Sequence, residues 1–189
     1  LIIFSDIDGT IMNHDNYSTG NLDSFFEKIK NEVDIIFNTS KTFEEVVILN
    51  KKFNINNPFI VENGACIFFP KDYVVKKDLN IKLFQHKNYF GYKLTKLCPK
   101  TIEKNFFDLK KKYNFSFYNE LSEQKFFEVT NLKKNNAKKS KIRLFTNPIL
   151  WEDSESKFID FKSEILSMDK NYHVVKGGRF IHISDNYNK

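Results

Sequence analysis

The chain has 189 residues, of which 41% are hydrophobic and 21 are phenylalanine, enough for one large domain or for a core with a smaller insert. We expect no transmembrane helix, because no run of about 18 apolar residues occurs, and we find no signal-peptide pattern. The net charge of +6 permits a nucleic-acid partner, but the lysines are spread over the whole chain, so we expect none.

The two cysteines indicate a reducing compartment. Cys66 and Cys98 lie far apart and belong to no Cys-x-x-Cys or Cys-His pattern. We therefore expect neither a disulfide scaffold nor a zinc site. Reduced thiols predict a cytoplasmic protein.

Apolar runs alternate with helical periodicity over the first third of the chain. This alternation predicts a parallel sheet with right-handed crossovers. The first run is continuously apolar, which is typical of a strand buried on both faces. The second helix is predicted to begin with a Thr-x-x-Glu capping box formed by Thr42 and Glu45. The predicted strands cover residues 1–4, 33–37 and 58–61, and the predicted helices cover 22–30 and 42–53.

After residue 64 the pattern changes to mixed helices and short strands, which predicts an α+β insert. A two-residue turn at Gly177 and Gly178 is expected to join the last two strands as a hairpin. The predicted strands are 66–69, 115–118, 141–145, 149–151, 172–176 and 179–184, the predicted helices are 101–113, one or two within 122–139, and 154–168, and residues 72–99 are expected to be irregular.

Two aspartates directly after the first strand carry the strongest chemical signal. Asp6 and Asp8 are two residues apart, so in an extended chain their carboxylates point the same way, and Gly9 permits a sharp turn after them. The carboxyl edge of a parallel sheet is where ligands bind. Two close carboxylates repel each other, and either a shared proton or a bound cation relieves that repulsion, for which a hard cation such as Mg²⁺ would suit the oxygen ligands. One could attack a phosphoryl group while the other acts as acid and base; the alternative is an Asp-Gly turn or a stray cation loop.

The segment Asp6-Ile7-Asp8-Gly9-Thr10 resembles the first motif of the haloacid-dehalogenase-type phosphatases. The resemblance implies that Asp6 is the nucleophile and Asp8 the general acid and base. It also implies that the Asp6 side chain and the Asp8 carbonyl bind Mg²⁺.

The second motif of that family is a hydroxyl residue at the end of the second strand. Thr39 is our choice for that hydroxyl, with Ser40 as the alternative, and Lys41 would add positive charge for a phosphoryl group. Taken without the first motif, Thr39 would be an ordinary strand-end hydroxyl.

The third motif is a lysine, for which Lys189 is the candidate. The fourth, Gly-Asp with a further aspartate for the metal, has no candidate and would lie beyond Lys189. Because the chain also begins with Leu1 and not with Met, we expect a fragment.

Further segments resemble the type-IIB, Cof-like branch of the family and, within it, the mannosyl-3-phosphoglycerate phosphatases. That substrate carries a phosphate, a carboxylate and a sugar. Arg143 and Arg179 have planar groups suited to its anionic parts, although each could be a solvated charge. Gly178 could let the backbone approach a ligand or could only form the hairpin turn. The matching segments are 39–42, 61–65 (with Asn63 and Gly64 in a loop at the site or in a simple turn), 148–153 and 176–182.

The resulting interpretation is an α/β protein with a Rossmann-like parallel-sheet core, incomplete at the C-terminus, and an inserted α+β cap. Residues 1–64 would belong to the core, 65–184 to the cap and 185–189 to the return into the core. The expected reaction is Mg²⁺-dependent hydrolysis of mannosyl-3-phosphoglycerate to the compatible solute mannosylglycerate through an aspartyl-phosphate. The alternatives are a phosphatase for glucosyl-3-phosphoglycerate or another sugar phosphate, and a non-catalytic module that binds an anionic sugar. The expected partner is a small-molecule sugar phosphate, with no membrane.

Overall fold

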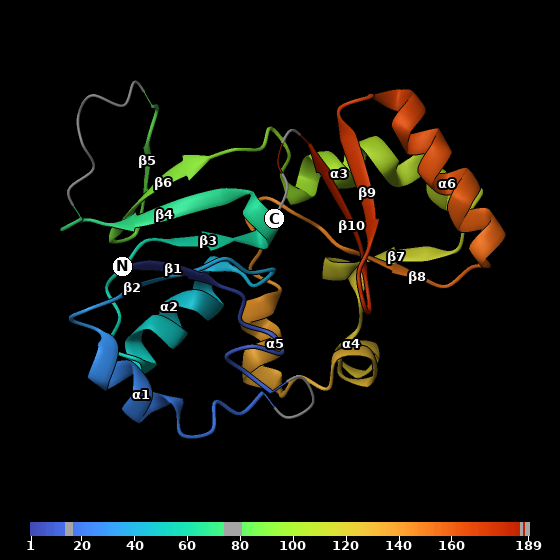
Figure 1. Cartoon of the computed structure of the whole chain (residues 1–189). Coiled ribbons are helices and arrows are strands. Elements are labelled where there is room, and N and C mark those ends of the chain that lie inside the picture. The colour runs from blue at the N-terminus through green and yellow to red at the C-terminus, as the bar shows by residue number, and fades with distance from the viewer. Residues whose placement is uncertain (14–16, 74–80, 186, 188–189) are drawn as a thin grey trace. The chain divides into compact units, whose positions relative to one another are not determined.

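The computed structural model describes residues 1–13, 17–73, 81–185 and 187. The chain forms two compact units, Leu1–Leu94 and Thr95–Tyr187, and each is described by itself (Figure 1). Among the helices of the described residues, none is both long and apolar enough to cross a membrane.

The first unit combines a parallel strand pair with an antiparallel sheet. β1 (Ile2–Ser5) and β2 (Asp34–Phe37) pair in parallel, as predicted, and one parallel bridge between Asn38 and Ile60 links the end of β2 to β3. The antiparallel sheet has the order β3-β4-β6-β5. Its strands are β3 (Phe59–Val61), β4 (Cys66–Pro70), β5 (Phe84–His86) and β6 (Tyr89–Lys93), and the helices are α1 (Leu22–Ile29) and α2 (Phe43–Lys52).

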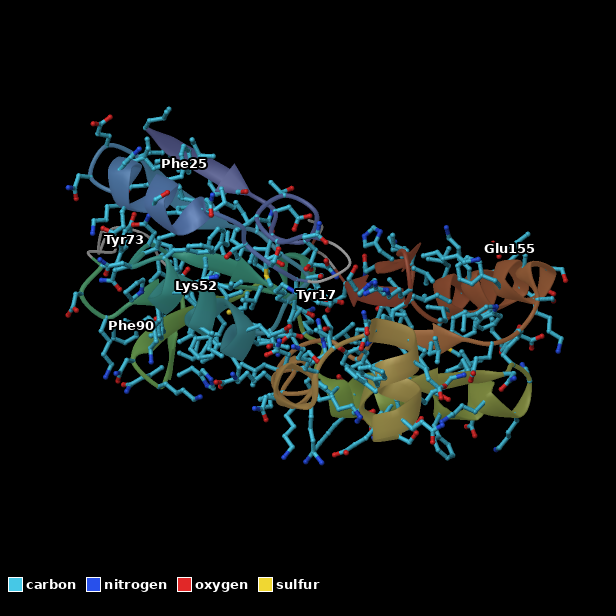
Figure 2. The ribbon with its side chains drawn as sticks, turned by 90° about the horizontal axis from the view of Figure 1, so that it is seen from below. Tyr17, Phe25, Lys52, Tyr73, Phe90 and Glu155 are labelled. Carbon is cyan, nitrogen blue, oxygen red and sulfur yellow. The ribbon has the colours of Figure 1, made fainter. Side chains whose placement is uncertain are left out.

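Aromatic packing and helix capping explain why these elements form. The rings of Phe26, Phe37 and Phe53 contact one another between α1, β2 and the end of α2, with centroids 4.3–6.4 Å apart. Phe25, labelled in Figure 2, lies next to Phe26 on α1 but is 51% exposed, so only one face of the helix packs inward. The predicted capping box of α2 is confirmed: the Thr42 side chain accepts from the backbone N–H of Glu45, whose carboxylate accepts from the Thr42 N–H at 2.9 Å.

The second unit is an antiparallel sheet of order β7-β8-β10-β9 that packs against α3 and α6. Phe106 of α3 and Phe161 of α6 meet the sheet residues Phe117 and Ile183 in one buried cluster. Glu155, labelled in Figure 2, lies exposed at the start of α6. The elements are α3 (Pro99–Phe106), β7 (Phe115–Phe117), α4 (Glu123–Thr130), α5 (Lys134–Ser140), β8 (Ile149–Trp151), α6 (Glu155–Met168), β9 (Tyr172–Lys176) and β10 (Ile181–Asp185).

The division between the two compact units falls between residues 94 and 95 of the chain. The sequence predicts a domain boundary after residue 64. Residues 65–94 stay with the first unit because β4 pairs with β3 along the register Phe59 to Phe68, and β6 pairs with β4. The assignment of a core and a cap as functional domains stays a prediction.

The prediction that the first strand is buried on both faces is wrong. Ile2 and Phe4 on one face of β1 are 56% and 63% exposed, and Ile3 on the other face is 41% exposed, so neither face is buried. The first predicted helix of the insert also ends early. It is α-helical only to Phe106 and continues as a 3₁₀ turn over Phe107–Lys111.

Three further expectations about local structure are wrong. The predicted irregular segment contains the β5–β6 hairpin, whose turn has Lys87 at φ 51°. The predicted strand 141–145 is a loop, since Ile142 turns back to bond the Lys139 carbonyl at 3.0 Å and no sheet strand lies in it. The last hairpin has a four-residue connection, because Lys176 pairs with Ile181.

Candidate active site

The expected site residues of the first unit gather at the carboxyl ends of three neighbouring strands. The two aspartates follow β1, residues 38–41 follow β2, and residues 62–64 follow β3. Backbone hydrogen bonds join these ends: the N–H of Asn38 donates to the Ser5 carbonyl at 2.8 Å, and the N–H of Thr39 donates to the Ile60 carbonyl at 3.1 Å. This edge of an open α/β arrangement is where ligands bind.

A tight loop after β1 fixes the two aspartates. Ile7 between them is fully buried, and its carbonyl accepts the backbone N–H groups of Ile11 and Met12 at 2.9 and 2.8 Å. Gly9 has φ 78°, a conformation that favours glycine. Asp6 and Asp8, on either side of the buried Ile7, are both half-buried.

A lysine ion pair holds Asp8. The Nζ of Lys41 lies 2.8 Å from Asp8 Oδ1 and 3.9 Å from the Glu45 carboxylate, and its side chain is only 9% exposed. Lys41 also lies 5.5 Å from the ring centroid of Tyr17. Asp6 is bound differently, since its Oδ1 accepts from the backbone N–H of Ile7 at 2.8 Å. The site therefore has one carboxylate neutralised by a buried cation and another fixed by the backbone.

The two candidate hydroxyls differ in exposure. Thr39 is fully buried, and its Oγ1 accepts from the backbone N–H of Lys41 at 3.2 Å. Ser40 is half-buried. In this structure Ser40 is thus the hydroxyl more accessible to a ligand.

The turn of Asn63 and Gly64 is tied to the second motif. The N–H of Asn63 donates to the Thr39 carbonyl at 2.9 Å, and the N–H of Glu62 donates to the Lys41 carbonyl at 3.0 Å. Asn63 has φ 62° and Gly64 has φ 101°, so the turn uses left-handed backbone at consecutive positions. The segment is therefore a turn that is hydrogen-bonded to the residues of the second motif, and its role at the site stays a prediction.

Sequence reasoning overlooked three neighbours of this edge. Glu62 is fully buried behind it, and burial together with Glu62 raises the pKa of the Cys66 thiol. Glu45 was read only as a capping residue, although its spacing of four from Lys41 could have revealed the pair. No sequence signal pointed to Tyr17.

The candidates of the second unit lie on separate segments. Arg143 follows α5, where its Nε donates to Thr146 Oγ1 at 2.8 Å and its guanidinium lies 5.6 Å from the Tyr118 ring centroid. Arg179 lies in the β9–β10 connection with Nη1 3.5 Å from the Thr130 carbonyl. A Cβ at Gly178 would meet no atom within 4 Å, so packing does not require glycine there. Lys189 lies outside the described residues.

The oxygen atoms at the edge of the first unit suit a hard cation. Within the described residues, no three His, Cys, Asp or Glu side chains are grouped to hold a metal ion. Mg²⁺ commonly takes only one or two carboxylates and completes its shell with water and substrate phosphate. Asn38 Oδ1, at the same edge, is buried and has no hydrogen-bond partner in the described part of the chain. Asp6 and Asp8 could therefore hold Mg²⁺.

Comparison with known proteins identifies the family of the chain. The profile of the haloacid dehalogenase-like hydrolases matches residues 3–184. A glucosyl-3-phosphoglycerate/mannosyl-3-phosphoglycerate phosphatase of Persephonella marina is 34% identical over 188 residues, which are 97% of this chain and 66% of that protein. Its counterpart in Methanococcoides burtonii is 32% identical over 100% of this chain and 68% of that protein.

The fold resembles that of a solved subclass IIB sugar phosphatase of the haloacid dehalogenase superfamily, with a TM-score of 0.58 and 12% identity over 100% of this chain and 71% of that one. The chain spans about two thirds of the length of the curated relatives. Because the family profile covers almost the entire chain and the aspartate motif stands at the expected strand end, the chain belongs to the haloacid dehalogenase-like hydrolases.

Proposed function

We propose that the chain is a Mg²⁺-dependent phosphatase for mannosyl-3-phosphoglycerate or glucosyl-3-phosphoglycerate, acting in the cytoplasm. The observation that carries the proposal is the convergence of Asp6, Asp8 and the buried Lys41 at one strand edge. Relatives named for these two substrates support the substrate class.

The reaction would proceed in two steps. A carboxylate oxygen of Asp6 attacks phosphorus and forms an aspartyl-phosphate, while the ester P–O bond breaks and Asp8, in its protonated form, gives its proton to the leaving oxygen. Asp8 then removes a proton from water as the water attacks phosphorus, which releases phosphate and restores Asp6.

The surrounding residues would support both steps. Lys41, 2.8 Å from Asp8, offsets negative charge at the edge. The Ser40 or Thr39 hydroxyl would donate to a phosphoryl oxygen, and the turn at Asn63 holds the segment that carries them. When bound to Asp6 and Asp8, Mg²⁺ would neutralise phosphoryl charge. The remaining proposed contacts of the phosphate or of the rest of the substrate are Lys189, Arg143, Gly178, Arg179 and Gly64.

The test is phosphate release from both substrates with Mg²⁺ and with chelator. We expect Asp6→Asn to lower release by at least about 10³-fold, because it removes the nucleophile. The matched control is Asp34→Asn, an exposed carboxylate at the opposite end of the β1–β2 pair, which should leave release unchanged.

Each outcome decides between the candidates. Turnover that survives Asp6→Asn would refute the covalent mechanism. Binding of these sugars without release of phosphate would favour the non-catalytic alternative. Faster release from one substrate identifies the sugar.

A further inference from the structure

One aromatic side chain of the first unit lies against the ion pair of Lys41 and Asp8. The loop that follows the two aspartates brings Tyr17 back to this pair, and the Lys41 ammonium lies 5.5 Å from the centre of the Tyr17 ring. An ammonium group within about 6 Å of a ring centroid is attracted by the negative face of the ring. The ring is therefore a third partner of Lys41, beside the carboxylates of Asp8 and Glu45.

The backbone holds Tyr17 in an unfavourable conformation. Its φ is 56°, a left-handed value that is uncommon for a residue with a bulky side chain. The N–H of Tyr17 donates to the Asn13 carbonyl at 3.0 Å, and the N–H of Asn13 donates to the Ser18 carbonyl at 2.8 Å. Thr19, 7% exposed, accepts from the ammonium of Lys52 at the end of α2 (Tyr17 and Lys52 are labelled in Figure 2). The loop is thus fastened on both sides of Tyr17, and strained backbone of this kind clusters at functional sites.

Two carboxylates compete for the Lys41 ammonium. Asp8 Oδ1 lies 2.8 Å from Nζ, and Glu45 Oε1 lies 3.9 Å from it. Glu45 is fixed in place, because its other oxygen accepts from the Thr42 N–H at 2.9 Å and from the Thr42 hydroxyl at 3.0 Å. A lysine carries its charge on a flexible stem, so a second carboxylate at this distance offers the ammonium an alternative position. The Lys41 side chain is nevertheless only 9% exposed, so its neighbours confine it.

We propose that Tyr17 is a positioning residue whose ring face holds the Lys41 ammonium on Asp8. The ring acts on the reaction only through the lysine, which offsets negative charge where a phosphoryl group would bind. The aromatic face carries this role, and the phenol hydroxyl does not. The consequence for phosphate release rests on the proposed function, whereas the contact between ring and ammonium does not.

The contact is tested by NMR of the whole chain with isotope-labelled lysine side chains. A ring shifts the signals of groups over its face upfield, so the ε-methylene signal of Lys41, identified by its loss in Lys41→Met, should be shifted. Tyr17→Leu removes the ring and should abolish the shift, whereas Tyr17→Phe should keep it. The matched control is Tyr73→Leu, which removes an exposed tyrosine of the same unit and should leave the signal unchanged (Figure 2).

Phosphate release measures what the contact does for the reaction. We expect Tyr17→Leu to lower kcat/KM by about tenfold, as for a largely desolvated contact between a cation and a ring, and Tyr17→Phe to retain most of it. Phenylalanines with one, two and three ring fluorines at position 17 weaken the negative ring face with little change in size. Release should therefore fall stepwise with fluorination, whereas a ring that only fills space would not respond.

Three results would overturn the proposal. They are a Lys41 signal that keeps its shift in Tyr17→Leu, a loss of activity in Tyr17→Phe as large as that in Tyr17→Leu, and a rate of release that ignores fluorination. If Tyr17→Leu fails to fold, the fluorinated series still decides, because each member keeps the ring and the backbone.

Failure of this inference is distinguishable from failure of the proposed function. Phosphate release that depends on Asp6 but not on the ring at position 17 refutes the positioning role alone. A Lys41 shift that disappears in Tyr17→Leu, in a chain that releases no phosphate, refutes the phosphatase alone.

Discussion

Replacement of Lys41 by methionine tests the ion pair at the centre of the candidate site. The Nζ of Lys41 lies 2.8 Å from Asp8 Oδ1, and the two side chains are 9% and 27% exposed. At an effective dielectric constant of about 20, two unit charges at that distance attract by about 6 kcal/mol before the costs of desolvation and ordering. Loss of one partner of a buried pair costs about 3–5 kcal/mol. Because water reaches Asp8, we expect a destabilisation of about 2 kcal/mol.

The assay must report on the first unit. The only tryptophan, Trp151, lies in the second unit, so its fluorescence reports on the wrong part of the chain. Amide hydrogen exchange of peptides from α2 and β2 reports the free energy of opening where Lys41 lies. We expect faster exchange there in Lys41→Met, whereas the exposed Lys51→Met serves as the control and should exchange like the unaltered chain.

A double-mutant cycle isolates the pair itself. Lys41→Met and Asp8→Asn should each destabilise the first unit, and the double variant should lose less than their sum by at least about 1 kcal/mol. Additivity within about 0.5 kcal/mol would show that the two side chains do not interact energetically, and the reasoning from the 2.8 Å distance would fail.

Two further predictions concern the first unit. Thr42→Ala removes the side-chain acceptor of the α2 capping box and should destabilise α2 by about 1 kcal/mol, seen as faster exchange of its first-turn amides; unchanged exchange would contradict it. Burial lowers the pKa of His86 in the folded chain, so the unfolded chain binds a proton there at a higher pH than the folded chain does. The contribution of neutral His86 to folding stability is therefore complete above about pH 6.5 and is lost as the pH falls below that value. Urea unfolding from pH 7 to pH 5 should therefore show a smaller loss of stability in His86→Gln, and an equal loss would refute the assignment.

The sequence determined features that depend on neighbouring residues. The capping box of Thr42 and Glu45, the parallel pairing of β1 with β2 and the long helix α6 follow from local spacing and apolar periodicity, and all three are confirmed. The aspartate motif likewise follows from the order of residues, since a strand followed by Asp6 and Asp8 places both at a strand end.

Local patterns failed where a strand partner decides the structure. Residues 141–145 have a strand-like sequence but pair with no strand of the described residues. The β5–β6 hairpin forms from a segment without clear apolar alternation, because β6 pairs with the edge of β4. The same dependence on β3 keeps residues 65–94 in the first unit.

Only the tertiary structure decided which polar groups meet. Lys41 and Asp8 are 33 residues apart in the chain, and Glu103 and Asn147 are 44 apart, yet each pair lies within 3 Å. No periodicity encodes such contacts, because they depend on how strands and helices pack after the local elements have formed. The sequence therefore predicts which chemical groups belong to the candidate site, whereas the packing of the chain determines which groups contact them.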